Sequence, residues 1–377
     1  MDTPARATLN VGTPPSAPYS HVVSARGLIY LSGVLADGPG RQILHKGNVA
    51  GQTRVVIERL RERLEAAGSS LAQVVSVMVY LKSAADFATM NEAFRAYWPS
   101  DPPTRTTVIA NLVLPDALVE MTMVAVPNGG ERQVIHPSGW QRSPSPYSYA
   151  IQAADVVFLS GLIARNGKDN SVVAGDITTQ TRAVLDNAAE ILAAAGRSLS
   201  DVVSARVYLP DASTFEPMNT EYRRSFSSAP PVRATVRAGL ASAPYLVEMT
   251  FIASAGPRTI VDPGGAPNPN LSTAIVSGGR VYLSGMLGNR TDTAGEVGKQ
   301  TTETLARIDR ALQTAGCTRS DIVDSLVYLT DVAAFPEMND AYRAYFGASA
   351  LPARATVESG LFASDGLVEI MMTAVQP

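Results

Sequence analysis

Pro103-Thr104-Arg105-Thr106-Thr107, followed by Val119-Glu120-Met121, is the first of three occurrences of one pattern in this chain. In each occurrence an arginine lies two residues after a proline, and a glutamate follows that arginine after fifteen residues. The other two pairs are Arg233 with Glu248 and Arg354 with Glu369. Both charges lie in apolar, strand-like sequence, where a charged side chain needs a partner. These three pairs are therefore the first candidates for a functional site.

Shorter motifs repeat in the same order around each pair, which identifies the chain as three tandem copies. The repeated motifs are Leu-Ser-Gly, Gln-Thr, Val-Tyr-Leu and Met-Asn, beginning in the first copy at Leu31, Gln52, Val79 and Met90. A period of roughly 120 residues is too long for a solenoid unit, so each copy is expected to be a small domain. We predict domains at residues 1–128, 129–256 and 257–377, joined by loops rich in Pro, Gly and Ser.

Composition excludes several classes of protein. The net charge is −3, with 31 basic and 34 acidic residues, and this balance does not suggest a nucleic-acid partner. A single cysteine, Cys317, allows no internal disulfide, and the three histidines have no counterparts in one another's copies. We therefore expect neither a metal cluster nor a Ser/His/Asp triad. No apolar run is long enough for a membrane helix, and the first residues lack a signal-peptide core, so a cytoplasmic location is expected.

The first copy predicts an α+β domain with helices on one face of a sheet. Residues 21–24 and 28–32 are expected to form a hairpin, and 74–81, 105–110 and 119–126 are expected to be further strands. Apolar residues recur at helical spacing over 49–67 and 85–98. The second face of such a sheet would stay uncovered in a single domain. Three copies solve this problem if their sheets meet at a shared axis, so we predict an intramolecular pseudo-trimer with sheets inside and helices outside.

The ordered set of motifs resembles the Rid family (also called YjgF) of imine and enamine deaminases, and the resemblance covers most of each copy. It rests on Pro18-Tyr19-Ser20, Ser32-Gly33, Gln52, Val79-Tyr80-Leu81, Met90-Asn91, the Pro103–Thr107 stretch and Val119-Glu120. The resemblance implies a chorismate-mutase-like fold, with active sites in clefts between domains. The sequence leaves open which two copies form each cleft.

By this resemblance, the arginines would bind the carboxylate of a small substrate, since a guanidinium offers a rigid fork of donors. The glutamates would activate the attacking water, which suits a carboxylate whose pKa is raised by burial. The resemblance also implies neutral substrate contacts in each copy and an aromatic wall in two copies. These residues are Ser32, Ser160, Ser284, Asn91, Asn219, Asn339, Thr107, Thr235, Thr356, Tyr19 and Tyr147. The resemblance implies no cofactor and no metal, because an imine is already electrophilic and is hydrolysed easily.

Each assignment has a structural alternative. The arginine and glutamate form only an ion pair in one alternative, and Asn91 caps a helix in another. Ser32-Gly33 is a tight turn and Thr107 an ordinary strand residue in a third. The aromatic residues near the end of the second helix of each copy favour core packing. Gln52 favours packing or a helix start.

The chain departs from the family pattern at two places. Apolar residues follow Ser-Gly in all three copies, namely Val34, Leu162 and Met286, and Leu271 replaces the tyrosine in the third copy. The third cleft is therefore expected to differ from the others. The principal functional hypothesis is hydrolysis of 2-imino or 2-enamino acids to 2-keto acids and ammonia. The alternatives are other hydrolase or lyase chemistry on a small carboxylated metabolite, and non-catalytic anion binding. The expected partner is a small carboxylate, and the chain is expected to be monomeric.

Overall fold

The computed structural model describes residues 6–264 and 268–377, and each copy repeats one arrangement of strands and helices. The first copy contains β1 (Arg6–Leu9), β2 (Val22–Ala25), β3 (Leu28–Val34), α1 (Val49–Ala66), β4 (Val74–Leu81), α2 (Phe87–Arg95), β5 (Thr104–Ile109), β6 (Asn111–Leu112) and β7 (Val119–Ala125). The second contains β8 (Gln133–Ile135), β9 (Ala150–Ala153), β10 (Val156–Leu159), α3 (Ile177–Ala194), β11 (Val202–Leu209), α4 (Phe215–Ser225), β12 (Val232–Arg237), β13 (Gly239–Leu240) and β14 (Glu248–Ser254). The third contains β15 (Thr259–Val261), β16 (Ala274–Ser277), β17 (Arg280–Leu283), β18 (Met286–Leu287), α5 (Val297–Thr314), β19 (Ile322–Leu329), α6 (Phe335–Phe346), β20 (Ala353–Glu358), β21 (Gly360–Leu361) and β22 (Val368–Val375).

The long helix of the first copy, predicted over 49–67, is α1 at Val49–Ala66, and the long helices of the first two copies have side-chain caps at their starts. The Asn48 side chain accepts a hydrogen bond from the Gly51 amide at the start of α1, and Asp176 caps α3 in the same way. Gly68 follows α1 with a φ of 74°, a left-handed conformation that favours glycine. The loop rich in Pro and Gly that was predicted to join the second and third copies includes residues 265–267, which lie outside the described residues.

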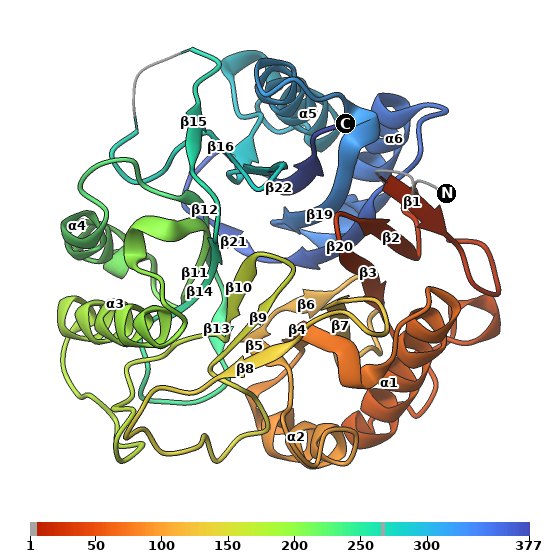
Figure 1. Ribbon diagram of the computed structural model, residues 1–377. Helices are drawn as coiled ribbons and strands as arrows, with labels where there is room; N and C mark the ends of the chain where they lie inside the picture. The colour runs from red at the N-terminus through yellow and green to blue at the C-terminus, as the bar shows by residue number, and fades with distance from the viewer. Residues whose placement is uncertain (1–5, 265–267) are drawn as a thin grey trace.

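Within each copy, one mixed sheet carries the two helices on its outer face. The strand order in the first copy is β1-β2-β3-β7-β4-β5, in which β4 and β5 are parallel and the other neighbours antiparallel. The other two copies keep this order. Figure 1 shows the helices at the rim of the molecule and the strands towards its centre. The predicted α+β class, with sheets inside and helices outside, is confirmed.

The copies also exchange short strands, which the sequence reasoning missed. The second copy's β13 pairs with β5 of the first copy, and the third copy's β21 pairs with β12 of the second. The exchange closes when β6 of the first copy pairs with β20 of the third. Each copy therefore lends two residues to the sheet of the preceding copy, and the first lends its own to the third.

Apolar residues form two kinds of core. Three clusters lie between a sheet and the helices of its own copy. Two further clusters contain residues of all three copies and bury the inner faces of the sheets. The tyrosine of Val-Tyr-Leu from each copy belongs to one of these, and the hydroxyls of Tyr208 and Tyr328 lie 3.4 Å apart. The second face of each sheet is therefore covered by the other copies, as predicted.

No helix among the described residues has the length and apolar character needed to span a membrane.

Candidate active site

The arginine and glutamate of one copy do not meet, because they lie on strands separated by a third strand. Arg105 pairs with Val77 on one side of β4, and Glu120 pairs with Tyr80 on the other side. Two strand spacings place such residues about 10 Å apart across the sheet. Each arginine instead lies beside the glutamate of another copy. We name the three sites the 1/2 cleft (Arg105 with Glu248), the 2/3 cleft (Arg233 with Glu369) and the 3/1 cleft (Arg354 with Glu120).

The serine of Ser-Gly joins the two copies at each cleft. Ser160 Oγ accepts a hydrogen bond of 2.9 Å from the backbone amide of Arg105 and donates one of 2.7 Å to the Ser148 carbonyl. Ser284 and Ser32 make the same pairs of bonds with Arg233 and Arg354. Because the only hydroxyl hydrogen is already donated, each serine positions the arginine strand here. A direct contact of these serines with substrate stays a prediction.

Each guanidinium is buried and lies against an aromatic ring. The three arginines are 3–4% exposed, and their Cζ atoms lie 4.6–4.9 Å from the ring centroids of Phe94, Tyr222 and Tyr342. These rings come from the aromatic stripe that the sequence analysis assigned to core packing. They do pack in the core, but they also stabilise the buried cation above their faces.

The candidate asparagines bind the arginines in two of the clefts. Arg233 and Arg354 each donate a hydrogen bond of 2.7 Å from Nη2 to the side-chain oxygen of Asn219 and Asn339. Asn91 is five residues into α2 and caps nothing, and its Oδ1 is buried without a partner among the described residues. The capping alternative therefore fails for Asn91. The 1/2 cleft differs because Arg105 lacks the asparagine contact seen in the other two.

Several buried polar atoms in the clefts have no partner within the described part of the chain. They are Nη1 of all three arginines, Nε of Arg233, Oγ1 of Thr107, Thr235 and Thr356, and Oε2 of Glu120. A buried donor without an acceptor costs free energy, about 1–3 kcal/mol for a neutral group and more for a charged one. The arginine Nη1 and the threonine Oγ1 atoms recur in all three copies, which makes the clefts candidate binding sites.

The glutamates are as buried as the arginines but are not ion-paired with them. Their exposure is 4–6%, and no arginine nitrogen lies within 4.0 Å of them in the described chain. The ion-pair alternative is therefore wrong for this structure. Burial raises the pKa of Glu120, Glu248 and Glu369 to about 8, and the charge of the facing arginine only partly offsets this. A carboxyl with a pKa near neutrality can both donate and accept a proton.

Cavities open at two of the clefts, each of about 70 Å³. Tyr19 lines the 3/1 cavity together with Phe335 and Thr356, and Tyr147 lines the 1/2 cavity together with Phe87 and Thr107. For comparison, a cavity of about 150 Å³ holds a benzene molecule. The space therefore suits a small ligand that extends through the open mouth.

The 2/3 cleft has a different wall. Leu271 stands where the other copies have tyrosine, and it is half-buried. The preceding Asn270 accepts a hydrogen bond of 2.9 Å from Arg223 of α4. This part of the third copy therefore binds the neighbouring helix, and the non-equivalence expected from the sequence is visible in the contacts.

Each of the three copies is similar to known proteins of one family. A family model described as Endoribonuclease L-PSP matches residues 11–127, 141–255 and 264–376. A RutC family protein of Sulfurisphaera tokodaii is 43% identical over 111 residues, which cover 29% of this chain and 89% of that protein. The 3-aminoacrylate deaminase RutC of Acinetobacter baylyi is 37% identical over 123 residues, covering 32% of this chain and 98% of that protein.

A solved chorismatase structure covers 80% of this chain and 93% of its own, with a TM-score of 0.53 and 14% identity. At this identity the likeness shows the fold alone. Fold and clefts together define an α+β protein of three tandem domains whose small polar sites lie at the domain junctions. Because the family model matches three times and both relatives are covered almost completely, this chain belongs to the Rid (YjgF) family and carries three copies of its domain.

Proposed function

We propose that the protein hydrolyses 2-imino and 2-enamino acids to 2-keto acids and ammonia in the clefts between its copies. The observation that carries this proposal is the set of unpaired donors on each buried arginine, facing a glutamate of another copy with a pKa of about 8. A substrate carboxylate would accept from the guanidinium and remove the cost of its unpaired donors. The relative named 3-aminoacrylate deaminase supports an enamine or imine substrate.

The proposed chemistry needs one carboxyl and one water. At neutral pH the protonated form of each glutamate predominates. The carboxyl therefore gives its proton to the imine nitrogen and makes the C=N carbon more electrophilic. The resulting carboxylate accepts a proton from the water that attacks this carbon. The tetrahedral carbinolamine then loses ammonia, and the C=O bond of the keto acid forms. An enamine would first be protonated at its carbon to reach the same iminium.

In this scheme the arginine holds the substrate and the glutamate moves protons. The unpaired threonine hydroxyls, such as Oγ1 of Thr107, would hydrogen-bond the substrate carboxylate or the attacking water. Tyr19 and Tyr147 would form the aromatic walls of the two open clefts. The neutral state of the glutamate also prevents it from capturing the arginine that the substrate needs.

The test is an imine-decay assay with arginine variants. An amino-acid oxidase would generate the imino acid in situ, and semicarbazide would trap what remains. The triple variant Arg105→Met, Arg233→Met and Arg354→Met is expected to lose at least about 100-fold in kcat/KM, since misplacing a substrate by about 1 Å can cost that much. Arg61, which is exposed on α1, provides the control substitution Arg61→Met and should leave activity unchanged.

Two outcomes would contradict the proposal. Wild-type protein that fails to accelerate imine decay for several side chains would exclude the reaction. If 2-keto acids nevertheless bind in an arginine-dependent way, the chain is an anion-binding protein. Activity only on a non-imine carboxylated substrate would favour the alternative hydrolase or lyase chemistry.

A further inference from the structure

Besides Arg354, the 3/1 cleft contains an arginine, Arg63, whose side chain has no hydrogen-bond or ion-pair partner among the described residues. Arg63 extends from α1 and lines the same cavity as Arg354 and Tyr19. Its Nη1 is buried without a hydrogen-bond acceptor in the described part of the chain, and no described carboxylate lies within 4.0 Å of it. Burial lowers the pKa of this guanidinium to about 10, so it stays charged at neutral pH.

The position of Arg63 is a core position in the other two copies. Counting from the shared Gln-Thr motif, the matching residues are Ile191 in α3 and Ala311 in α5. Both are inaccessible members of the helix-covered apolar cores. Replacing such a residue by an unpaired cation costs free energy, so packing alone does not explain the arginine.

The other charges of this cleft leave Arg63 unneutralised. Arg59 donates hydrogen bonds of 2.8 Å to the Leu35 carbonyl and 3.1 Å to Oδ1 of Asp37. The Asp37 carboxylate is therefore already paired with Arg59. The remaining acid of the cavity is Glu120, whose pKa of about 8 keeps it mostly protonated at neutral pH. Arg41, the fourth arginine of the cavity, lies 3.8 Å from Oδ2 of the same Asp37. Arg354 and Arg63 are therefore the two arginines of the cavity with no carboxylate within 4.0 Å among the described residues, and a ligand with two anionic groups would satisfy them.

The 1/2 cleft also contains a further arginine, but this one comes from a loop and not from a helix. Arg165 lies in the loop after β10 and lines the cavity with Arg105 and Glu248. Its Nε donates a hydrogen bond of 3.1 Å to the Tyr245 hydroxyl, which orients the side chain. Among the described residues, no carboxylate oxygen lies within 4.0 Å of Arg165, so its guanidinium is not ion-paired.

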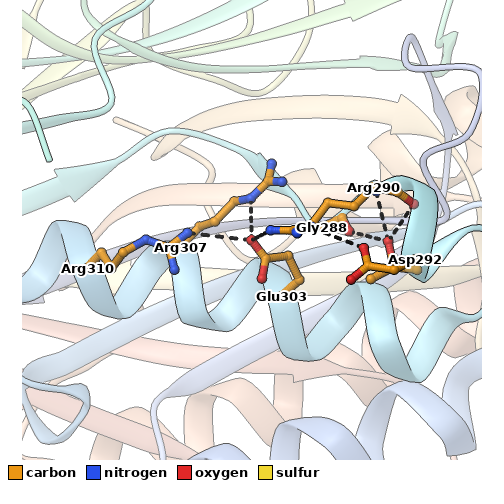
Figure 2. A network of polar contacts seen from close by, with 7 residues as sticks. Gly288, Arg290, Asp292, Glu303, Arg307 and Arg310 are labelled. Atoms are coloured by element: carbon orange, nitrogen blue, oxygen red, sulfur yellow. Dashed lines mark hydrogen bonds and ion pairs between the residues drawn. The ribbon is translucent and has the colours of Figure 1, made fainter. Parts of the chain in front are cut away.

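In the third copy, by contrast, the arginines near the long helix are paired with a carboxylate. Figure 2 shows Arg290, Arg307 and Arg310 gathered around the Glu303 carboxylate, at 3.9, 2.9 and 3.5 Å. Arg307 matches Arg59, whereas Glu303 matches the apolar residues Val55 and Ala183. The helix beside the 2/3 cleft therefore pairs its cations internally and carries alanine at the Arg63 position.

We propose that the 3/1 and 1/2 clefts bind ligands with two anionic groups. Arg354 and Arg105 hold one group, and Arg63 and Arg165 hold the other. The 2/3 cleft lacks this second site. If the protein hydrolyses imines as proposed above, this inference names the substrate class as imino acids with a second acidic group, and this part of it rests on the proposed function. The binding claim itself does not depend on turnover.

Calorimetry on the full chain tests the inference with two stable probes. 2-Oxoglutarate has two carboxylates, and 2-oxopentanoate has the same five-carbon chain with one. The dicarboxylate is expected to bind two sites per chain at least about tenfold more tightly, which is the effect of one charge-assisted hydrogen bond. The double variant Arg63→Ile and Arg165→Met should abolish this preference and leave 2-oxopentanoate affinity within about twofold.

Two controls keep the result interpretable. Isoleucine already occupies the matching position in α3, so the core is expected to accept Arg63→Ile, and the pair Arg63→Gln and Arg165→Gln serves as a second, polar variant. Arg61→Met removes an exposed arginine from the same helix, where it pairs with Glu58, and should leave both affinities unchanged.

Equal affinity of the wild-type chain for both probes would overturn the inference. A preference that survives in both double variants would overturn it too, as would an equal loss of affinity for both probes. A chain that prefers the dicarboxylate but hydrolyses no imine would sink only the proposed function. A chain that hydrolyses imines without this preference would sink only the second anion site.

Discussion

At the scale of single residues, the glycine after each serine leaves room for a glutamate. A Cβ atom built on Gly33, Gly161 or Gly285 would lie 1.9 Å from Oε1 of the glutamate in its own copy. None of these glycines has a positive φ among the backbone conformations that the structure describes, so a tight turn is not their purpose. Their lack of a side chain lets the carboxyl reach the cleft.

We therefore expect alanine at these positions to displace the carboxyl and reduce catalysis. The triple variant Gly33→Ala, Gly161→Ala and Gly285→Ala should lose at least about 100-fold in kcat/KM for imine hydrolysis. Gly256→Ala is the matched control, because a Cβ there would make only ordinary contacts of 3.4 Å or more. Unchanged turnover in the triple variant would mean that the carboxyl position is unimportant.

The raised pKa of the glutamates predicts a pH dependence of stability. Glu369 has an ordinary pKa of 4.5 when unfolded and about 8 when folded, so the folded chain binds its proton more tightly. Its stabilising effect is therefore complete below pH 4.5 and is lost as the pH rises towards 8. The loss amounts to about 1.4 kcal/mol per pH unit in that interval.

Glu369→Gln removes this titration. The free energy of unfolding in urea, measured from pH 5 to pH 8, should fall less steeply in this variant than in the wild type. Glu92→Gln, at an exposed position of α2, is the control and should keep the wild-type slope. Identical slopes for all three proteins would show that the Glu369 carboxyl is not raised by burial.

At the scale of elements, a glutamine near the start of each long helix fixes the loop before the glutamate strand. The Gln180 side chain in α3 donates a hydrogen bond of 3.2 Å to the Pro244 carbonyl and accepts one of 2.9 Å from the Leu246 amide. Gln52 and Gln300 bind the matching loops in the same way. The sequence suggested packing or a helix start for Gln52, whereas the structure shows that its side chain holds the loop before β7 by hydrogen bonds.

Gln180→Leu keeps the approximate size but leaves both backbone groups unpaired. It should lower the free energy of unfolding by about 1–3 kcal/mol, because the Pro244 carbonyl and the part-buried Leu246 amide lose their partner and the carbonyl, on an exposed residue, can turn to water. It should also reduce turnover, because Glu248 follows this loop directly. Gln313→Leu, at an exposed site on α5, should change stability by less than about 0.5 kcal/mol. Equal effects of the two substitutions in urea unfolding would contradict this role.

Local pattern explains why so many elements could be predicted from sequence. Helical spacing over 49–67 and the β-branched run at 74–81 fix α1 and β4 nearly to the residue. The two-residue strands β6, β13 and β21 could not be predicted, because their partners lie in another copy and no local period encodes them. The position of Arg105 at the same cavity as Glu248 could not be predicted for the same reason.

The candidate site was predictable where the same residue type repeats in all three copies. Arginine, glutamate and threonine recur at fixed spacing, and they do gather in the clefts. Arg63 escaped prediction because it occurs in one copy only, on a helix face that otherwise reads as core. Its signal was the mismatch with Ile191 and Ala311, which becomes visible only when the copies are compared position by position.

At the scale of the whole molecule, the cyclic exchange of strands leads us to propose that one chain acts as a pseudo-trimer. Each sheet is completed by another copy of the same chain, so no further chain is needed to build a cleft. Light scattering should therefore give a mass near the 39.7 kDa of one chain. A particle of three chains that dissociates only on unfolding would indicate that copies exchange between chains.

The central claim is that each catalytic unit takes its arginine from one copy and its glutamate from another. Steady-state kcat/KM for imine hydrolysis, measured on paired variants, tests it most directly. Arg105→Met with Glu248→Gln disables one cleft and should lose no more activity than Arg105→Met alone. Arg105→Met with Glu120→Gln disables two clefts, so its loss should equal the sum of the two single losses. The same comparison applies to each arginine in turn. If the same-copy pairs behave as single units and the cross-copy pairs add, the account is wrong.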